Sequence, residues 1–336
     1  MRILVTGGAG YIGSVSVEAF LAAGHEVTVL DDLSTGHRAA IADGARFELG
    51  TYTDSTAVAR LLETHRIDAV LHCGAKSLVS ESMTDPAKYF RENVTGGIAL
   101  LEGMREAGVK RIVFSSTAAT YGMPERTPIS EADPLHPINA YGETKRSVEG
   151  AIRWYCHGYG FRSVILRYFN AAGASARNGE QHVPETHLIP NVLLAAEGLS
   201  TVTLFGDDYP TPDGTCVRDY IHVEDLARAH LLALEATAPA ATGIGTPEAV
   251  SEPLICNLGS GTGFSNSEVV AAAEQVVGHP IPVQLGPRRA GDPPVLVASS
   301  DRARDVLGWQ PVHGTIEEMI GSAWEWRRKH PGGYAE

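Results

Sequence analysis

A glycine-rich turn near the N-terminus constrains the fold more than any other feature of this sequence. Arg2–Thr6 reads as a short apolar strand, and the residues after it, GGAGYIGS, open an Ala-rich helical stretch that runs to about Ala23. Glycine permits a tight turn and lets backbone N–H groups approach a pyrophosphate, which the N-terminus of the helix also attracts. The segment therefore predicts a dinucleotide-binding turn built on Gly7, Gly10 and Gly13.

The acid at the end of the second predicted strand bears on whether the cofactor is NAD or NADP. This strand begins at Glu26, and Asp31 lies at its end. A carboxylate at this place accepts hydrogen bonds from the adenosine ribose hydroxyls. Asp32 beside it would repel a 2′-phosphate, whereas Arg38 would attract one. The two adjacent acids favour NAD over NADP as the cofactor.

The first half of the chain continues to alternate between strand and helix patterns. Asp68–His72 (DAVLH) and Arg111–Ser115 (RIVFS) are continuous apolar runs, and Pro86–Ala107 and Tyr141–His157 have helical periodicity. Strands that are apolar throughout, separated by helices, are typical of a parallel sheet covered on both faces. Right-handed crossovers then predict an α/β fold with a doubly wound, Rossmann-type parallel sheet.

The second half is less regular and predicts a smaller α/β unit. Gly, Pro, Asn and Asp are frequent from Asn170 to Gly214, with a helix expected at Leu188–Gly198. We expect a dinucleotide-binding domain over residues 1–172 and a mainly substrate-binding domain over 173–336, with later segments returning to the first. The segment 236–253 is rich in small residues and proline and is expected to be a mobile surface loop.

Composition excludes several classes of function. With 336 residues the chain can bury a sizeable core, and its 27 basic against 40 acidic residues disfavour nucleic-acid binding. The four cysteines lie far apart and have no metal-ligand spacing, so no metal is expected. No apolar run approaches the length of a membrane span, and Met1 leads directly into a strand. We therefore expect a cytoplasmic protein that contacts no membrane.

Two residues four apart on a predicted helix suggest acid–base chemistry. Tyr141 and Lys145 share one helix face, and Thr117 follows a predicted strand whose carboxyl end is where such folds bind ligands. A phenol has a pKa of about 10, but a nearby ammonium and a nicotinamide cation would both favour the phenolate. We predict Tyr141 as the base, Lys145 as its electrostatic support and Thr117 as a hydroxyl that relays the proton.

At this point the segments are recognisable together. TGGAGYIGS, FSSTAATYG, YGETK, RYFNAAG, FGDDYPTPDGTCVRDYIHVEDLA, NLGSG and PRRAGD resemble the UDP-glucose 4-epimerase family of extended short-chain dehydrogenases/reductases, from Met1 to about Pro331. The resemblance implies an isomerase that holds one NAD and interconverts UDP-glucose and UDP-galactose. A hydride leaves sugar carbon 4, the 4-keto sugar rotates, and the hydride returns to the opposite face. It also implies a homodimer formed through the helices near 86–107 and 141–157.

The same resemblance assigns supporting roles along the chain. Cofactor contacts are implied for Tyr11, Ile12, Asp31, Lys145 and Phe169, in addition to the three glycines of the turn. Sugar-nucleotide contacts are implied for Thr117, Asn170, Phe205, Arg218, Tyr220, Arg289, Asp292 and Leu296. Of these, Phe205 is expected near the uracil, Arg218 and Arg289 at the diphosphate, and Leu296 at a gate to the sugar pocket. Three positions, Thr51, Ser77 and His187, depart from the commonest family pattern.

Other functions remain open from the residues. A UDP-N-acetylhexosamine epimerase, or one acting on other UDP-sugars, would use the same machinery. A dehydratase of the same fold carries Asp-Glu after the threonine, where this chain has Ala118 and Ala119. A sugar-nucleotide reductase would prefer NADP, which Asp31 and Asp32 disfavour. A regulatory NAD-sensing protein would have no need of Thr117, Tyr141 and Lys145 together.

Overall fold

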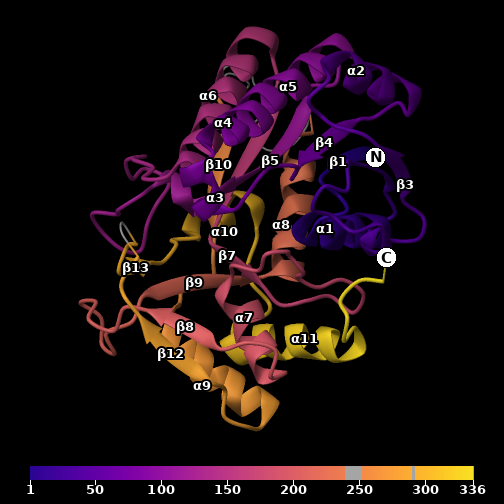
Figure 1. The fold of residues 1–336 in the computed structure, drawn as a ribbon. Helices are drawn as coiled ribbons and strands as arrows, with labels where there is room; N and C mark the ends of the chain where they lie inside the picture. The colour runs from indigo at the N-terminus through magenta and orange to yellow at the C-terminus, as the bar shows by residue number, and fades with distance from the viewer. Residues whose placement is uncertain (239–251, 290–291, 336) are drawn as a thin grey trace.

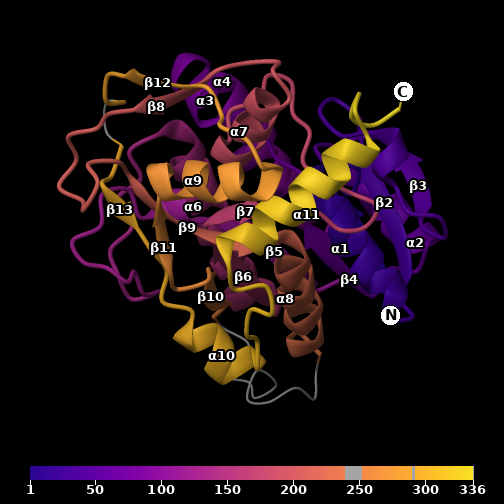
Figure 2. The same cartoon turned by 90° about the horizontal axis from the view of Figure 1, so that it is seen from below.

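The computed structural model describes residues 1–238, 252–289 and 292–335 (Figure 1). Most of the segment 236–253, predicted as a mobile loop, lies outside these residues. Two layered units are present, one around a large sheet and one around smaller sheets (Figures 1 and 2). Within the described parts of the chain, no helix is both long and apolar enough to cross a membrane.

The large sheet confirms the predicted doubly wound fold. Its strands are β1 (Arg2–Thr6), β2 (Glu26–Asp31), β3 (Arg46–Leu49), β4 (Ala69–His72), β5 (Arg111–Thr117), β6 (Arg162–Tyr168) and β10 (Leu254–Leu258). All pair in parallel, in the order β10-β6-β5-β4-β1-β2-β3. The order reverses between β1 and β4, and ligands of such sheets bind at this switch point, beyond the carboxyl ends of the strands.

Helices cover both faces of this sheet, which explains its continuous apolar strands. Helices α1 (Tyr11–Ala22), α8 (Val223–Ala236) and α10 (Asp301–Leu307) lie on one face, and α2 (Ser55–Thr64), α5 (Gly96–Glu106) and α6 (Ala140–Tyr159) on the other (Figure 1). Side chains alternate along each strand. Val5 therefore packs in the first core and its neighbour Leu4 in the second.

The single helix predicted over 86–107 is interrupted in the structure. After α3 (Val79–Thr84) come α4 (Pro86–Tyr89), a π-helical turn (Phe90–Thr95) and then α5. Such wide turns occur often at functional sites. Here the turn carries Asn93, whose buried amide donates to the Thr144 hydroxyl at 3.0 Å and bonds both backbone groups of Lys76. The interruption thus ties the loop after β4 to α6.

The second unit is built mainly from the later part of the chain. Its strands are β7 (Asn170–Ala172), β8 (Val202–Phe205), β9 (Val217–His222), β11 (Gly263–Ser265), β12 (Val283–Gly286) and β13 (Val295–Leu296). Its helices are α7 (Leu188–Ala196), α9 (Asn266–Val277) and α11 (Ile316–Lys329). Two short 3₁₀ turns, Arg38–Ala40 and Ala118–Thr120, lie in the first part of the chain, after β2 and β5. Three elements that follow residue 172, α8, β10 and α10, pack on or join the large sheet, so the chain returns to the first unit after entering the second. The domain boundary at residue 172 stays a prediction.

Candidate functional site

A cleft of about 1010 Å³ opens between the two units, at the carboxyl ends of the large sheet. This volume exceeds what a single drug-sized ligand needs. Every site residue predicted from the sequence lines it: Gly7, Gly10, Tyr11, Ile12, Gly13, Asp31, Thr117, Tyr141, Lys145, Phe169, Asn170, Phe205, Arg218, Tyr220, Arg289, Asp292 and Leu296. The structure thus brings together, in one cleft, residues that are distant in the sequence.

The glycine turn lies at the switch point and fits a dinucleotide. Gly7 has φ +70°, and a Cβ there would lie 2.6 Å from the backbone nitrogen of Gly74 in the loop after β4. A Cβ on Gly13 would lie 2.1 Å from the Gly7 carbonyl oxygen. Gly10 precedes α1 and has no side chain that could cap the N–H groups of the first turn, whose residues Tyr11, Ile12 and Gly13 line the cleft. This arrangement leaves a cradle for phosphate at a helix N-terminus.

Asp31 is held rigidly beside this turn. Its carboxylate accepts backbone hydrogen bonds from Ala9 at 3.0 Å and Leu33 at 2.8 Å, and burial raises its pKa although these bonds oppose the rise. The basic residue that would have favoured NADP is engaged elsewhere, because the Arg38 guanidinium lies over the Phe47 ring at 4.0 Å. Both observations fit an unphosphorylated ribose.

Tyr141 and Lys145 project from the first turns of α6 toward the end of β5. Asn139 caps this helix by accepting from the backbone N–H of Gly142, which fixes its start. The Lys145 ammonium donates to the Ser115 carbonyl at 2.8 Å and lies 6.0 Å from the centre of the Tyr141 ring. The predicted pair therefore shares one wall of the cleft.

In the protein alone, burial shifts the pKa values of Tyr141 and Lys145 in the direction that favours the uncharged form of each side chain. Burial raises the pKa of Tyr141 to about 12, with the Thr117 hydroxyl opposing the rise, and burial lowers the pKa of Lys145 to about 8. Lys145 is therefore too weakly coupled to Tyr141 to produce a phenolate on its own. A phenolate at neutral pH therefore needs stabilisation beyond what the protein alone supplies. A positive charge that enters the cleft with a ligand would supply it.

The opposite wall carries the predicted sugar-nucleotide contacts. Arg218 on β9 donates to Asp292 at 2.5 Å, so the acid holds this guanidinium in place at the cleft. The Arg289 guanidinium lies over the Phe205 ring at 4.0 Å. An arginine stacked on an aromatic ring next to a second, paired arginine suits a base followed by a diphosphate.

A buried ion pair behind Lys145 was not found from the sequence. Glu149, one turn further along α6, accepts from Arg167 on β6 at 2.5 and 3.0 Å, and their side chains are 6% and 3% exposed. Arg167 also donates to the Tyr121 hydroxyl, which donates to Asn257 on β10. The two partners come from different elements, so only the helical spacing of Lys145 and Glu149 could have hinted at them.

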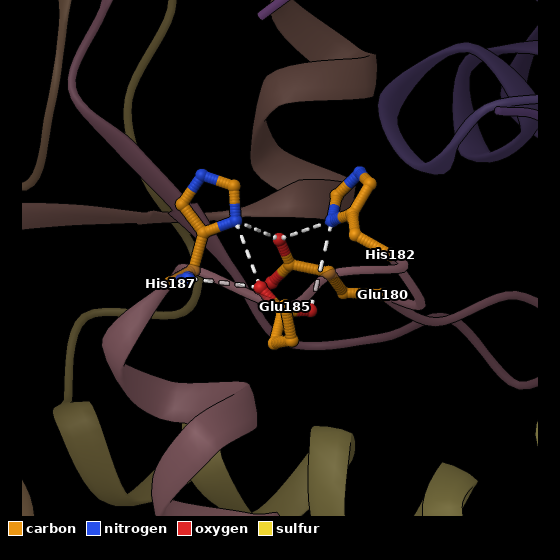
Figure 3. A group of neighbouring side chains, drawn as sticks. All are labelled: Glu180, His182, Glu185 and His187. Carbon is orange, nitrogen blue, oxygen red and sulfur yellow. Dashed lines mark hydrogen bonds and ion pairs between the residues drawn. The ribbon is translucent and has the colours of Figure 1, made fainter. Parts of the chain in front are cut away.

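A second group missed by the sequence lies at the edge of the cleft. Glu180, His182, Glu185 and His187 gather in the loop before α7 (Figure 3). Their ligand atoms all lie within 4.8 Å of one another. The signal for this group is the segment EQHVPETH, in which a glutamate is followed two residues later by a histidine twice. The spacing of the cysteines, on which the expectation of no metal rests, carries no information about it.

Comparisons with known proteins agree with this site. The model of the NAD dependent epimerase/dehydratase family matches residues 3–245. A UDP-glucose 4-epimerase of Lacticaseibacillus casei is 49% identical over all of this chain and 99% of its own.

Solved structures lead to the same family. A UDP-glucose 4-epimerase of Brucella ovis in complex with NAD has a TM-score of 0.91 and 43% identity, covering 96% of this chain and 97% of its own. One of Bifidobacterium longum in complex with NAD⁺ and UDP has a TM-score of 0.91 and 34% identity, covering 99% and 100%. The chain belongs to the NAD dependent epimerase/dehydratase family and, within it, to the UDP-glucose 4-epimerases.

Proposed function

We propose that this chain interconverts UDP-glucose and UDP-galactose, with NAD as its resident cofactor. The observation that carries the proposal is the meeting of Tyr141, Lys145 and Thr117 with the glycine turn in one cleft. Full-length identity near one half to UDP-glucose 4-epimerases supports the same substrates. The reaction is an isomerisation with no net oxidation.

The residues of the cleft divide the work of the reaction. When bound, NAD supplies a reversible hydride acceptor for sugar carbon 4. Tyr141 accepts the proton of the 4-hydroxyl, Thr117 relays it, and Lys145 stabilises the phenolate and holds the cofactor ribose. The remaining side chains bind and orient: Gly7, Gly10, Tyr11, Ile12, Gly13, Asp31 and Phe169 on the cofactor side, and Asn170, Phe205, Arg218, Tyr220, Arg289 and Asp292 on the sugar-nucleotide side.

The high pKa of Tyr141 in the protein alone fits this division. Without a cation in the cleft the phenol stays protonated, since its pKa is about 12. Binding of the oxidised cofactor, whose nicotinamide ring carries a positive charge, would lower the pKa of Tyr141 and prepare the base only when the hydride acceptor is present. The protonation state of Tyr141 would thereby depend on the oxidation state of the bound cofactor.

A dehydratase is disfavoured by the residues beside Thr117. Elimination needs an acid and a base at this place, whereas the 3₁₀ turn after β5 begins with Ala118 and Ala119. A reductase that uses NADP is disfavoured by Asp31 and by the stacking of Arg38 on Phe47. Epimerisation of UDP-N-acetylhexosamines stays open as a second activity of the same site.

Cofactor content tests the proposal independently of turnover. The 4-keto sugar must rotate while the reduced cofactor stays in place, so NAD is expected to co-purify with the protein. Acid precipitation followed by an enzymatic assay of the supernatant measures it. Finding no dinucleotide, with activity restored by NADP alone, would contradict the assignment of Asp31.

Leu296 is expected to set the size of the sugar that is accepted. It lines the cleft while packing against Ala118, Tyr121 and Phe169, so an N-acetyl group at carbon 2 would have to displace a packed side chain. Such displacement costs ~1–3 kcal/mol, or roughly 5- to 150-fold in rate. We expect Leu296→Gly to raise the kcat/KM for UDP-N-acetylglucosamine relative to UDP-glucose. Val295→Gly, on the same strand but outside the cleft lining, serves as the control. An unchanged substrate ratio in Leu296→Gly would rule out the gate.

We also propose a cytoplasmic location, which the four free cysteines support.

We further propose that the protein is a homodimer. Phe90 in the π-helical turn, Ile98 on α5 and Trp154 on α6 have exposed apolar side chains. These three helical segments contact one another, and α5 and α6 lie side by side (Figure 1). Trp154, 69% exposed, is expected to be buried between subunits, so Trp154→Glu should shift the protein to monomers in light scattering after gel filtration. Leu199→Glu changes a side chain that is 68% exposed elsewhere and should leave the dimer intact. A monomeric unmodified protein would refute this interface.

A further inference from the structure

Two buried carboxylates at the edge of the cleft have an unusual set of partners. The side chains of Glu180 and Glu185 are 9% and 8% exposed. Among the described residues, their ion-pair partners are two histidines, His182 and His187, with no lysine or arginine. Two negative charges in a poorly hydrated place require compensation. Either two protons or one divalent cation can provide it.

The separations within the group match those of a metal site. Nδ1 of His182 lies 3.3 Å from Glu180 and 3.7 Å from Glu185, and Nδ1 of His187 lies 2.7 and 3.3 Å from the same two residues (Figure 3). Four tetrahedral ligands about 2.0–2.1 Å from a zinc ion lie about 3.3–3.4 Å from one another. Small side-chain adjustments would therefore place an ion at the centre.

The orientation of the ligand atoms adds a second observation. Nδ1 of His182 is buried and makes no hydrogen bond, although it points into the group. Glu185 is held in place because it accepts from the backbone N–H groups of Thr186 at 2.7 Å and His187 at 2.8 Å. Although burial opposes it, the carboxylates raise the pKa of His182 to about 9 and that of His187 to about 10. Each imidazole must lose its proton to bind an ion, so an ion would compete with protons for the negative field of the two carboxylates.

We propose that Glu180, His182, Glu185 and His187 form a four-coordinate site for a divalent transition-metal cation, with zinc as the best chemical match. Two imidazoles with two carboxylates suit this class of ion, and four protein ligands are typical of a structural site. The ion would cross-link the loop that leads into α7. It would also cancel two negative charges that act on Tyr11, next to a cleft lined for diphosphates.

Metal analysis tests this site without reference to turnover. Protein stripped with EDTA, dialysed and titrated with ZnCl₂ is expected to bind one ion per chain and to unfold at a higher temperature. Titration with CoCl₂ is expected to give the visible absorption of four-coordinate cobalt. Absence of both the thermal shift and the cobalt bands would overturn the proposal. Two protonated histidines would then balance the negative charges of Glu180 and Glu185.

Variants locate the ion. His182→Gln and His187→Gln are each expected to weaken zinc binding at least about 100-fold, since even partners of metal ligands contribute 10- to 100-fold. Glu185→Gln keeps an acceptor for the two backbone N–H groups while removing a charged ligand, so it should fold and still lose zinc.

The control variant lies in a second, more open group. His222, Glu224 and His313 also cluster, but this group offers three ligands with a single carboxylate, whereas the proposed site offers four ligands with two carboxylates. His313→Gln is therefore expected to retain zinc fully. Loss of zinc in His313→Gln, or retention in Glu185→Gln with circular dichroism unchanged, would overturn the assignment to Glu180–His187.

Discussion

Replacing Tyr141 with phenylalanine is expected to lower turnover of UDP-galactose by about 10²- to 10⁴-fold, the usual contribution of a general base. The substitution removes only the ionisable oxygen from a side chain that is otherwise buried beside Lys145. The protein should fold, and its NAD content should stay at the level of the unmodified protein. Steady-state rates together with cofactor content measure both expectations.

A matched control and a second variant distinguish the role of Tyr141 as the base from the role of Lys145 in stabilising its phenolate. Tyr159→Phe changes an exposed tyrosine on the same helix and should leave the rate unchanged. Lys145→Met should lose turnover and also weaken retention of NAD, because the ammonium is assigned to both phenolate and ribose. A rate close to that of the unmodified protein for Tyr141→Phe would transfer the role to Thr117.

The buried pair between Arg167 and Glu149 is expected to carry the largest effect on stability. Arg167→Met preserves much of the volume but leaves a carboxylate buried without its cation, which typically costs about 3–5 kcal/mol. Thermal and denaturant unfolding, followed by circular dichroism, measure the loss. Arg146→Met, which breaks an exposed pair with Glu143, should cost no more than about 1 kcal/mol.

The double variant Glu149→Leu/Arg167→Met distinguishes a missing interaction from an unpaired charge. Removing both charges avoids the uncompensated carboxylate, so it should recover much of the stability lost in Arg167→Met. A double variant as unstable as the sum of the two single ones would show that the network, including Tyr121 and Asn257, contributes mainly through its hydrogen bonds.

Local patterns were sufficient for four strands of the large sheet, β1, β2, β4 and β5, and for the cofactor side of the cleft. The strands after Arg2, Glu26, Asp68 and Arg111 were predicted within about two residues, because parallel buried strands are apolar on both faces. The glycine turn and Asp31 follow from short-range geometry. The residues of the substrate wall were reached only through resemblance to a family, because β7, β9 and β13 are short and carry little pattern of their own.

The remaining features depend on tertiary contacts that no local pattern encodes. The π-helical turn at Phe90–Thr95 interrupts a segment whose periodicity indicates one helix. The partnership of Glu149 with Arg167, and the return of β10 to the large sheet beside β6, join elements far apart in the chain. Burial raises the pKa of Tyr141 in the protein alone, and no local pattern encodes this effect, since desolvation depends on what surrounds the phenol rather than on its neighbours in sequence.

The fate of a deuterium label at sugar carbon 4 tests the central claim most directly. UDP-galactose labelled there is incubated with the purified protein and no added cofactor, and the product is examined by NMR and mass spectrometry. Because the hydride would stay on the bound cofactor and return to the same carbon, we predict UDP-glucose that keeps the deuterium at carbon 4, with no stoichiometric accumulation of NADH. Release of a keto or reduced sugar with matching cofactor turnover, or loss of the label to solvent, would contradict the account.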